Sequence, residues 1–424
     1  MTNKEYDVAV IGSGPGGLAA GIAAKKNGAE KVLIIERDRE LGGILLQCIH
    51  NGFGLEVFKE DLPGPSYAQR FIHEARKLKV DALLDTMVLE VTPDKKIFAV
   101  SQSEGILEIN ARAVVLAMGC RERTRPQLRL PGSRPAGIFT AGTAQRWVNM
   151  EGFMPGNRFV ILGSGDIGMI MARRLTFEGA QVERVLEVMP YLSGLMRNYV
   201  QCLLDYDIPL QLQHTVKRIM GRSRLEAVEA VGVDENWVPL AGTEEVIPCD
   251  TLLLSVGLIP ENELSRKAGV KIDPLTGGPY VDNNFQTNLE GIFSAGNVVH
   301  VYDLVDWVTE AGTIAGEAAA RQIQGLAHKT RTLVPIHAGR NVRYVVPHML
   351  DLNDLQQREV RLQMRVKVPI EKPVWVEATD GNNLITRRGF PYARPGEMVT
   401  LTLKPDHAEA IRSGNRLDIH ITER

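Results

Sequence analysis

The sequence has few cysteines, no excess charge of either sign and no long apolar run. Its four cysteines stand far apart in 424 residues, without a C-x-x-C pair or a His/Cys cluster of metal-binding spacing. We therefore expect neither a disulfide framework nor a metal site. Lys and Arg total 49 against 51 Asp and Glu, which gives a net charge of -2. The chain therefore has no excess of positive charge to attract nucleic acid or an anionic membrane.

No stretch reaches the roughly 18 apolar residues that span a membrane, and the first residues lack the charged and apolar regions of a secretory leader. We expect a cytoplasmic chain without a membrane span. Hydrophobic residues make up 44% and charged residues 24% of the chain, which is typical of globular proteins. At about 150 residues per domain, the length suggests roughly three domains.

Glycine is abundant instead, with 40 residues, and many glycines follow apolar runs of β type. One arrangement of strand, glycine turn, helix and strand occurs twice. The segments are 6–11, 12–17, 18–27 and 31–36 in the first copy, and 158–162, 163–168, 169–178 and 182–187 in the second. Two copies are too few for a solenoid and predict two nucleotide-binding domains.

Each glycine of the first turn, GSGPGG, has its own task. Gly12 permits the tight turn, Gly14 lets a pyrophosphate approach the main chain, and Gly17 lets the helix pack close to the sheet. The helix N-terminus offers N–H groups and positive potential to phosphates. Glu36 follows Gly17 by 19 residues, where a carboxylate can accept hydrogen bonds from both ribose hydroxyls. The alternative is a turn with a purely structural role.

The second turn, GSGDIG, repeats this pattern, and Glu187 again lies 19 residues beyond its last glycine. A carboxylate at this position repels a 2′-phosphate, so we expect NAD(H) rather than NADP(H). Arg184 lies close in sequence and is the residue that would serve a phosphate if the site took NADP(H).

The motifs together resemble a known class of enzymes. Besides the two fingerprints, they are Ala117–Gly119 (AMG), Ser255–Asn262 (SVGLIPEN) and Phe293–Asn297 (FSAGN). Over residues 5–325 the chain is similar to the two-dinucleotide-fold flavoprotein reductases of the pyridine nucleotide-disulfide oxidoreductase class. The resemblance implies an FAD-dependent NAD(P)H oxidoreductase. In this class the first fingerprint binds FAD, the second binds NAD(P)H, and the NAD domain is inserted in the FAD domain.

The tail has a different pattern. Apolar and polar residues alternate strictly over 360–368, which indicates a half-exposed strand, and 374–378 and 398–403 repeat the pattern. We therefore expect an α/β fold of two Rossmann-like domains followed by a C-terminal all-β domain. The expected domains are 1–125 (FAD-binding, first part), 126–258 (NAD(H)-binding, with a connector at 121–135), 259–327 (FAD-binding, return) and 328–424 (β-rich).

The resemblance also implies which residues bind the cofactors. Gly296 and Asn297 take the place of the class's Gly-Asp, so a charge is lost while hydrogen bonding is kept. For FAD the residues are Gly12, Ser13, Gly14, Pro15, Gly16, Gly17, Glu36, Arg37, Gly42, Gly43, Val88, Ala117, Met118, Gly119, Gly296, Asn297, Asp306, Trp307 and Val308. For NAD(H) they are Gly163, Gly165, Asp166, Ile167, Gly168, Glu187 and Gly257.

By the same resemblance, the helix that begins near residue 305 points its N-terminus at the flavin pyrimidine, where its dipole stabilises negative charge. Asp303 and Asp306 are interpreted as ordinary helix acids, or for Asp306 as a cofactor contact. His300 and Trp307 are candidates to line the isoalloxazine, and the alternative for His300 is a purely structural histidine.

The redox cysteine pair of the class's disulfide reductases falls here at Leu45 and His50, with Cys48 between them. We therefore expect no thiol-disulfide relay. The candidate catalytic residues are His50, Cys48 and Asn51. His50 is either a proton donor beside the flavin or a residue that shapes its loop. Cys48 would act as a peroxidase-type nucleophile, whereas Cys120 is interpreted as a packed small residue.

The segments 42–54, 118–125 and 294–312 resemble a narrower group. These are the flavoprotein subunits associated with anaerobic glycerol-3-phosphate dehydrogenase, related to the larger subunits of hydrogen cyanide synthase, opine oxidase and dye-linked proline dehydrogenase. The resemblance implies hydride exchange with NAD(H) and electron transfer to or from a second flavoprotein, an electron-carrier subunit or a small acceptor. A stand-alone NADH oxidase or peroxidase, a non-catalytic flavoprotein module and a homo-oligomer stay open.

Overall fold

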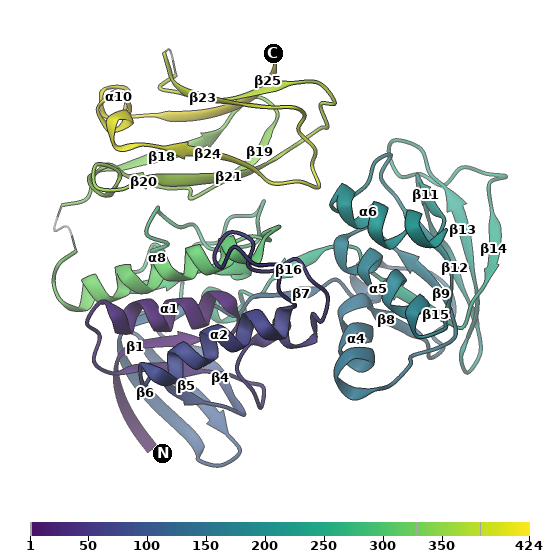
Figure 1. Ribbon diagram of the computed structural model, residues 1–424, viewed down its shortest axis with the longest axis horizontal. Helices are drawn as coiled ribbons and strands as arrows, with labels where there is room; N and C mark the ends of the chain where they lie inside the picture. The colour runs from purple at the N-terminus through teal and green to yellow at the C-terminus, as the bar shows by residue number, and fades with distance from the viewer. Residues whose placement is uncertain (1, 328–329, 382) are drawn as a thin grey trace. The chain divides into compact units, whose positions relative to one another are not determined.

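The computed structural model describes residues 2–327, 330–381 and 383–424, and the chain forms two compact units (Figure 1). Unit 1 comprises Met1–Cys120 and Pro260–Arg424, and unit 2 comprises Arg121–Ile259. Unit 2 is therefore an insertion in the sequence of unit 1. The boundary expected near residue 328 lies outside the described residues.

A seven-stranded sheet forms the base of unit 1. Its order is β3-β2-β1-β6-β5-β4, and β17 also pairs with β6. Strands β1, β2, β3, β6 and β17 run parallel, while β4 and β5 pair antiparallel. The central parallel strands are buried on both faces, which explains their continuous apolar runs. The bounds are β1 Thr2–Ile11, β2 Val32–Ile35, β3 Asp81–Leu83, β4 Thr86–Val91, β5 Lys96–Ser101, β6 Gly105–Leu116 and β17 Ile292–Ser294.

Two helices, α1 and α8, lie side by side in unit 1 (Figure 1). A Cβ atom added at Gly312 would collide with the carbonyl oxygen of Gly16, and one at Gly316 with that of Ala20. The glycines of α8 thus let two helix backbones touch. Among the described residues, no helix is both long and apolar enough to cross a membrane. The helical bounds are α1 Pro15–Lys26, η1 Gly43–Gln47, α2 Gly64–Lys77, α7 Glu263–Lys267, η4 Gly296–Val298 and α8 Val305–Ile323.

Unit 2 contains a parallel sheet of order β11-β10-β9-β15-β8 and an antiparallel sheet of order β12-β13-β14. The expected connector 121–135 is partly regular, because a capping box formed by Thr124 and Gln127 starts helix α3 there. The strands are β8 Ile138–Thr140, β9 Arg158–Leu162, β10 Gln181–Glu187, β11 Leu210–Leu212, β12 His214–Gly221, β13 Leu225–Gly232, β14 Glu245–Pro248 and β15 Thr251–Leu254. The helices are α3 Arg125–Leu128, α4 Ala141–Arg146, the π-helix η2 Trp147–Glu151, α5 Asp166–Phe177, α6 Met196–Cys202 and η3 Leu204–Tyr206. Two further strands, β7 Cys120–Glu122 and β16 Leu258–Pro260, pair with each other.

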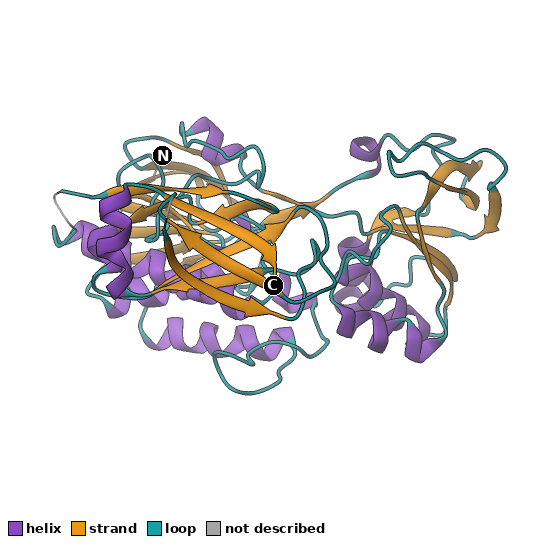
Figure 2. Cartoon of the chain, turned by 90° about the horizontal axis from the view of Figure 1, so that it is seen from above, coloured by secondary structure: helices purple, strands orange, loops and turns teal. Residues whose placement is uncertain are grey.

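Residues 333–424 form a sandwich of two sheets, β20-β18-β25-β22-β23 and β19-β21-β24, called here the C-terminal sandwich. Figure 1 shows its strands as a layer on the side of α8, and Figure 2 shows the chain from above with strands in orange and the C-terminus marked. The prediction of a C-terminal β region is confirmed, although short helices also occur in it and it is therefore not all-β. The bounds are β18 Leu333–Ala338, β19 Val342–Val346, β20 Met349–Asp351, α9 Leu352–Leu355, β21 Val360–Val366, β22 Val374–Thr379, β23 Leu384–Phe390, β24 Val399–Leu403, η5 Pro405–His407, α10 Ala408–Gly414 and β25 Leu417–Glu423.

The sequence pattern had indicated that β21 is half exposed. The structure shows instead that protein covers most of both its faces. Leu362 and Met364 point into the sandwich core as expected. On the other face, however, Gln363 is only 4% exposed, and the side chain of Arg365 is 15% exposed. A period of two separates the faces of a strand, but it does not tell whether water or protein covers the polar face.

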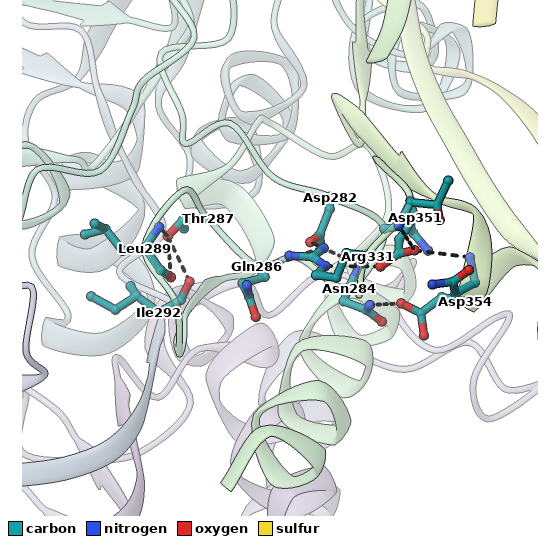
Figure 3. A network of polar contacts seen from close by, with 12 residues as sticks. Asp282, Asn284, Gln286, Thr287, Leu289, Ile292, Arg331, Asp351 and Asp354 are labelled. Carbon is teal, nitrogen blue, oxygen red and sulfur yellow. Dashed lines mark hydrogen bonds and ion pairs between the residues drawn. The ribbon is translucent and has the colours of Figure 1, made fainter. Parts of the chain in front are cut away.

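A network of buried charges joins the C-terminal sandwich to the rest of unit 1 (Figure 3). Arg331 donates to Asp282 and, through Nε at 3.1 Å, to Asp351. Asn284 donates to the carboxylate of Asp354. The carboxylates of Asp282, Asp351 and Asp354 are nearly fully buried, so their charges depend on these partners.

Replacing Arg331 with Met leaves Asp282 and Asp351 buried without their counter-charge. We expect the attachment of the sandwich to lose about 3–5 kcal/mol, the usual cost of breaking a buried ion pair on one side. Hydrogen exchange measured by mass spectrometry on peptides from β18 and β20 should then accelerate. Arg412→Met on the exposed side of α10 is the matched control. Equal exchange in both variants would show that the network does not hold the sandwich.

Candidate functional site

The segments expected to bind FAD lie at one edge of the unit 1 sheet because their strands end in register. Ile11 pairs with Ile35 and with Leu116, and Leu116 pairs with Ser294. The carboxyl ends of β2, β1, β6 and β17 therefore share one edge, which is where folds of this type bind ligands. The segments that follow these ends are Glu36–Arg37, Gly12–Gly17, Ala117–Gly119 and Gly296–Asn297.

The first glycine turn has the geometry that its motif predicts. Gly12 has φ +99°, and a Cβ there would lie 2.5 Å from the carbonyl oxygen of Ala117. A Cβ at Gly17 would collide with the carbonyl oxygen of Gly12. Within the described part of the chain, by contrast, a Cβ at Gly14 would meet no atom within 4 Å, and no side chain caps helix α1 there. This open, uncapped helix N-terminus fits a pyrophosphate group.

Glu36 ties this turn to the end of β2. Its Oε2 accepts hydrogen bonds from the N–H of Ser13 at 2.8 Å and from the Ser13 hydroxyl at 2.6 Å. Its Oε1 accepts from the N–H of Asp38 at 2.9 Å. An ionised carboxylate has about four acceptor positions, and the three hydrogen bonds from described residues use three of them. The N–H of Gly42 donates to Ser13 Oγ at 3.2 Å, which brings the Gly42–Gly43 segment against the same turn.

Unit 2 repeats this arrangement bond for bond. Glu187 Oε2 accepts from the N–H of Ser164 at 2.9 Å and from its hydroxyl at 2.6 Å, and Oε1 accepts from Met189 N–H at 2.9 Å. The N–H of Ser193 donates to Ser164 Oγ at 2.9 Å. The separations of 23 and 29 residues are the same in both units. Sequence reasoning missed Ser164 and Ser193, although the shared serine of the two turns was a visible signal.

The two turns differ in the space that they leave. In unit 2, the hydroxyl of Ser255 accepts a hydrogen bond from the N–H of Gly168 at 3.0 Å. A Cβ at Gly165 would lie 3.2 Å from this hydroxyl, whereas the corresponding Gly14 faces open space. Asp166 Oδ1 accepts a hydrogen bond from the N–H of Leu195 at 2.8 Å. The loop between β10 and α6 therefore also covers the start of α5. The second site is therefore narrower beside its glycine turn than the first.

Arg184 is committed to other groups of unit 2. Its Nη1 donates to Glu245 Oε2 at 2.5 Å and to Gln211 Oε1 at 2.9 Å. This pairing counts against its use for a 2′-phosphate and favours the expected preference for NAD(H).

The first turn of α8 holds a distant loop. Asp306 is only 3% exposed, and its carboxylate accepts hydrogen bonds from Gly54 N–H at 3.2 Å and Val57 N–H at 3.0 Å. Trp307 Nε1 donates to Glu56 Oε2 at 3.0 Å. Asp306 is therefore a loop-binding residue and not an ordinary solvent-facing helix acid.

Asn297 links two of the expected FAD segments. Its Nδ2 donates to Cys120 Sγ at 3.7 Å, and its Oδ1 accepts from Tyr302 N–H at 3.2 Å. Cys120 thus serves as a packing partner beside the Ala117–Gly119 turn. The side chain of Asn297 shapes the chain between η4 and α8.

The remaining residues that were expected to bind FAD or NAD(H) differ in burial and in their distance from the glycine turns. Gly43 approaches Gly14 so closely that a Cβ on it would lie 2.9 Å from Gly14 Cα. Arg37 is exposed, and Met118 is half-buried. Val88 lies in β4 with its side chain in the buried core, and its assignment to FAD stays a prediction. In unit 2, Ile167 packs on the core, and Gly257 has φ +96° with open space beside it.

The catalytic candidates occupy the loop after η1. Cys48 is 8% exposed, its thiol donates to the carbonyl of Ile44 at 3.3 Å, and burial raises its pKa to about 12. A thiol with this pKa is protonated at neutral pH, so the geometry does not support Cys48 as a nucleophile. His50 is half-buried with Nδ1 2.9 Å from the carbonyl oxygen of Asn51, which is itself exposed.

His300 is a buried structural residue and does not line an open site. It is 1% exposed, its Nε2 lies 3.1 Å from Gln363 Oε1, and its ring lies tilted against that of Tyr302, with the ring centroids 4.1 Å apart. Burial lowers the pKa of His300 to about 3, and the nearby Arg365 guanidinium adds to this effect. The imidazole is therefore neutral at neutral pH.

Comparison with known proteins shows the family of this chain. Residues 6–324 match the family described as pyridine nucleotide-disulphide oxidoreductase. The chain belongs to this family. The predicted fold class is thereby confirmed, and membership implies FAD and NAD(P)H as cofactors. Thioredoxin reductase of T. acidophilum superposes on 75% of this chain and 98% of its own, with a TM-score of 0.62 and 22% identity.

Two curated relatives are themselves named as subunits. One is an opine oxidase subunit of Agrobacterium tumefaciens (strain Ach5), which is 25% identical over 333 residues, or 74% of this chain and 64% of that protein. The other is the hydrogen cyanide synthase subunit HcnB of Pseudomonas protegens, which is 25% identical over 282 residues, or 62% of this chain and 58% of that protein. The present chain thus matches less than two thirds of the length of either relative.

The neutral His300 predicts a loss of stability in acid. Its folded pKa of about 3 lies below the 6.5 of an ordinary histidine, so the unfolded chain binds more protons between these values. The contribution of His300 to the free energy of unfolding is complete above pH 6.5. As the pH falls below this value, the contribution declines by up to about 1.4 kcal/mol per pH unit. Thermal unfolding at pH 7.5, 6.5 and 5.5 should therefore show a shallower decline for His300→Gln than for the wild type. Parallel declines would contradict the buried neutral state.

Proposed function

We propose that the protein is an FAD-dependent oxidoreductase that exchanges a hydride with NAD(H) and passes electrons to or from a second flavoprotein, an electron-carrier subunit or a small acceptor. No internal redox disulfide takes part. The observation that carries this proposal is the duplicated cradle, in which a glycine turn and a serine-bound carboxylate recur in both units. FAD is assigned to the turn at Gly12–Gly17 and NAD(H) to the turn at Gly163–Gly168.

Bound FAD supplies the two-electron chemistry, and the chain supplies binding, orientation and electrostatics. The N-terminus of α1 beside Gly14 holds the pyrophosphate, and the remaining acceptor position of Glu36 binds a ribose hydroxyl. Helix α8 also begins without a side-chain cap, so its positive end is available to stabilise negative charge on the reduced ring.

His50 is the residue that we assign to proton transfer. When Nδ1 carries its proton and donates to the carbonyl of Asn51, Nε2 is the basic nitrogen of the ring and the atom that takes and returns a proton. Asn51 then acts through its main chain by setting the tautomer of His50. The absence of a thiol relay is supported by the burial of Cys48 and by the lack of any C-x-x-C pair in the sequence.

The partner proposal is supported by the two relatives that are named as subunits. An association with an anaerobic glycerol-3-phosphate dehydrogenase system rests on the resemblance of segments 42–54, 118–125 and 294–312. We also propose a cytoplasmic location, since such a system draws on the NAD(H) pool.

The alternative is a stand-alone NADH oxidase or peroxidase. A peroxidase would need Cys48 as a thiolate, and the raised pKa of its thiol counts against this. We expect Cys48→Ser to change NADH-driven turnover by less than about twofold, because a buried protonated thiol adds no nucleophile. Steady-state turnover with oxygen or peroxide as acceptor provides the measurement. A complete loss of peroxide turnover, with FAD still bound, would instead establish the peroxidase.

The central test is anaerobic stopped-flow reduction of the FAD-loaded protein, followed in the flavin absorbance band. We expect NADH to bleach the band rapidly and NADPH to do so at least about tenfold more slowly, because Glu187 repels a 2′-phosphate. Glu187→Gln should narrow this preference, and Glu183→Gln, on the same strand but outside the turn, is the matched control. No bleaching by either nucleotide would favour the non-catalytic flavoprotein module.

A further inference from the structure

The polar face of β21 meets the chain that leads from Asn297 into α8. Arg361, Gln363 and Arg365 alternate along this face, and each contacts the segment 300–310. Residues 299–304 of this segment form neither helix nor strand. The segment's conformation therefore depends on contacts made from outside it.

Arg361 connects three parts of unit 1. Its Nη1 lies 3.6 Å from Glu56 Oε2, and its Nε lies 3.3 Å from Glu310 Oε2. Its guanidinium also stands 5.6 Å from the ring centroid of Trp307, whose Nε1 donates to the same Glu56. One cation of the C-terminal sandwich thus holds the first turns of α8 together with the loop that Asp306 binds.

Gln363 and Arg365 hold the irregular stretch. Gln363 Oε1 lies 3.1 Å from Nε2 of His300, whose ring makes a tilted contact with that of Tyr302. The Nη2 of Arg365 donates to the carbonyl of Val301 at 3.3 Å and pairs with the carboxylate of Asp303. The N–H of Tyr302 donates to Asn297 Oδ1, and Asn297 is one of the residues expected to bind FAD. The contacts of β21 with residues 300–303 therefore act on Asn297 through Tyr302.

We propose that the polar face of β21 is a clamp that positions the flavin-binding segment, fixing Asn297 and the first turn of α8 before FAD arrives. The inference rests on the proposed FAD site. Arg361, Gln363 and Arg365 are positioning residues, because they act through Trp307, His300 and Asp303. Prior ordering of a binding segment raises affinity, since less conformational entropy is lost on binding.

The test compares full-length variants by FAD titration, visible circular dichroism of the bound flavin and hydrogen exchange of the peptide 297–310 in the FAD-free chain. Arg361→Gln and Gln363→Met should each weaken FAD binding about fivefold, as expected for loss of one ion pair or hydrogen bond. Both should alter the flavin dichroism and accelerate exchange in 297–310. Arg361→Lys keeps the charge and should recover binding to within about twofold.

Lys367→Gln is the matched control, because Lys367 continues the same alternation but is exposed. Wild-type FAD affinity, dichroism and exchange in both Arg361→Gln and Gln363→Met would overturn the clamp. A lowered melting temperature with unchanged dichroism and unchanged exchange in 297–310 would also overturn it, because that result describes a merely structural role. Failure of the wild type to bind FAD would instead refute the proposed function, while the exchange data would still decide whether β21 orders the segment.

Discussion

The candidate sites depend on one contact, a carboxylate at the end of a buried strand that accepts the N–H and hydroxyl of a serine in the glycine turn. Glu36 and Ser13 make it in unit 1, and Glu187 and Ser164 make it in unit 2. A buried carboxylate is costly unless donors surround it, so the turn and the strand end stabilise each other. The contact fixes the open side of the turn and keeps one acceptor position for a ligand.

The two copies of this arrangement of glycine turn, serine and carboxylate differ at the end of the strand beside the turn, which is β6 in unit 1 and β15 in unit 2. Ala117 follows β6 without offering a hydroxyl, and the space beside Gly14 stays open. Ser255 follows β15, and its oxygen accepts a hydrogen bond from the helix start, which narrows the second site. Ser255, together with the contact of Asp166 to Leu195, therefore distinguishes the two turns within an otherwise repeated main-chain frame.

The C-terminal sandwich is integrated into unit 1 and is not an independent appendix. Arg331 joins it to Asp282, and the polar face of β21 joins it to the segment before α8. Buried ion pairs contribute little net stability but strongly disfavour alternative placements, because separating them leaves unpaired charges. Such contacts suit a domain that must hold another segment in one position.

The sequence by itself determined the two repeated strand, turn and helix units and the need for glycine at Gly12 and Gly17, because these follow from local patterns of apolar residues and glycine. It also predicted three strands of the tail, β21, β22 and β24. Only the tertiary structure decided what covers them: Cys48 and His300 became buried packing residues, Asp306 became a loop anchor, and the polar face of β21 met protein instead of water. Burial and pKa depend on contacts between residues far apart in the chain, and no local pattern records those contacts.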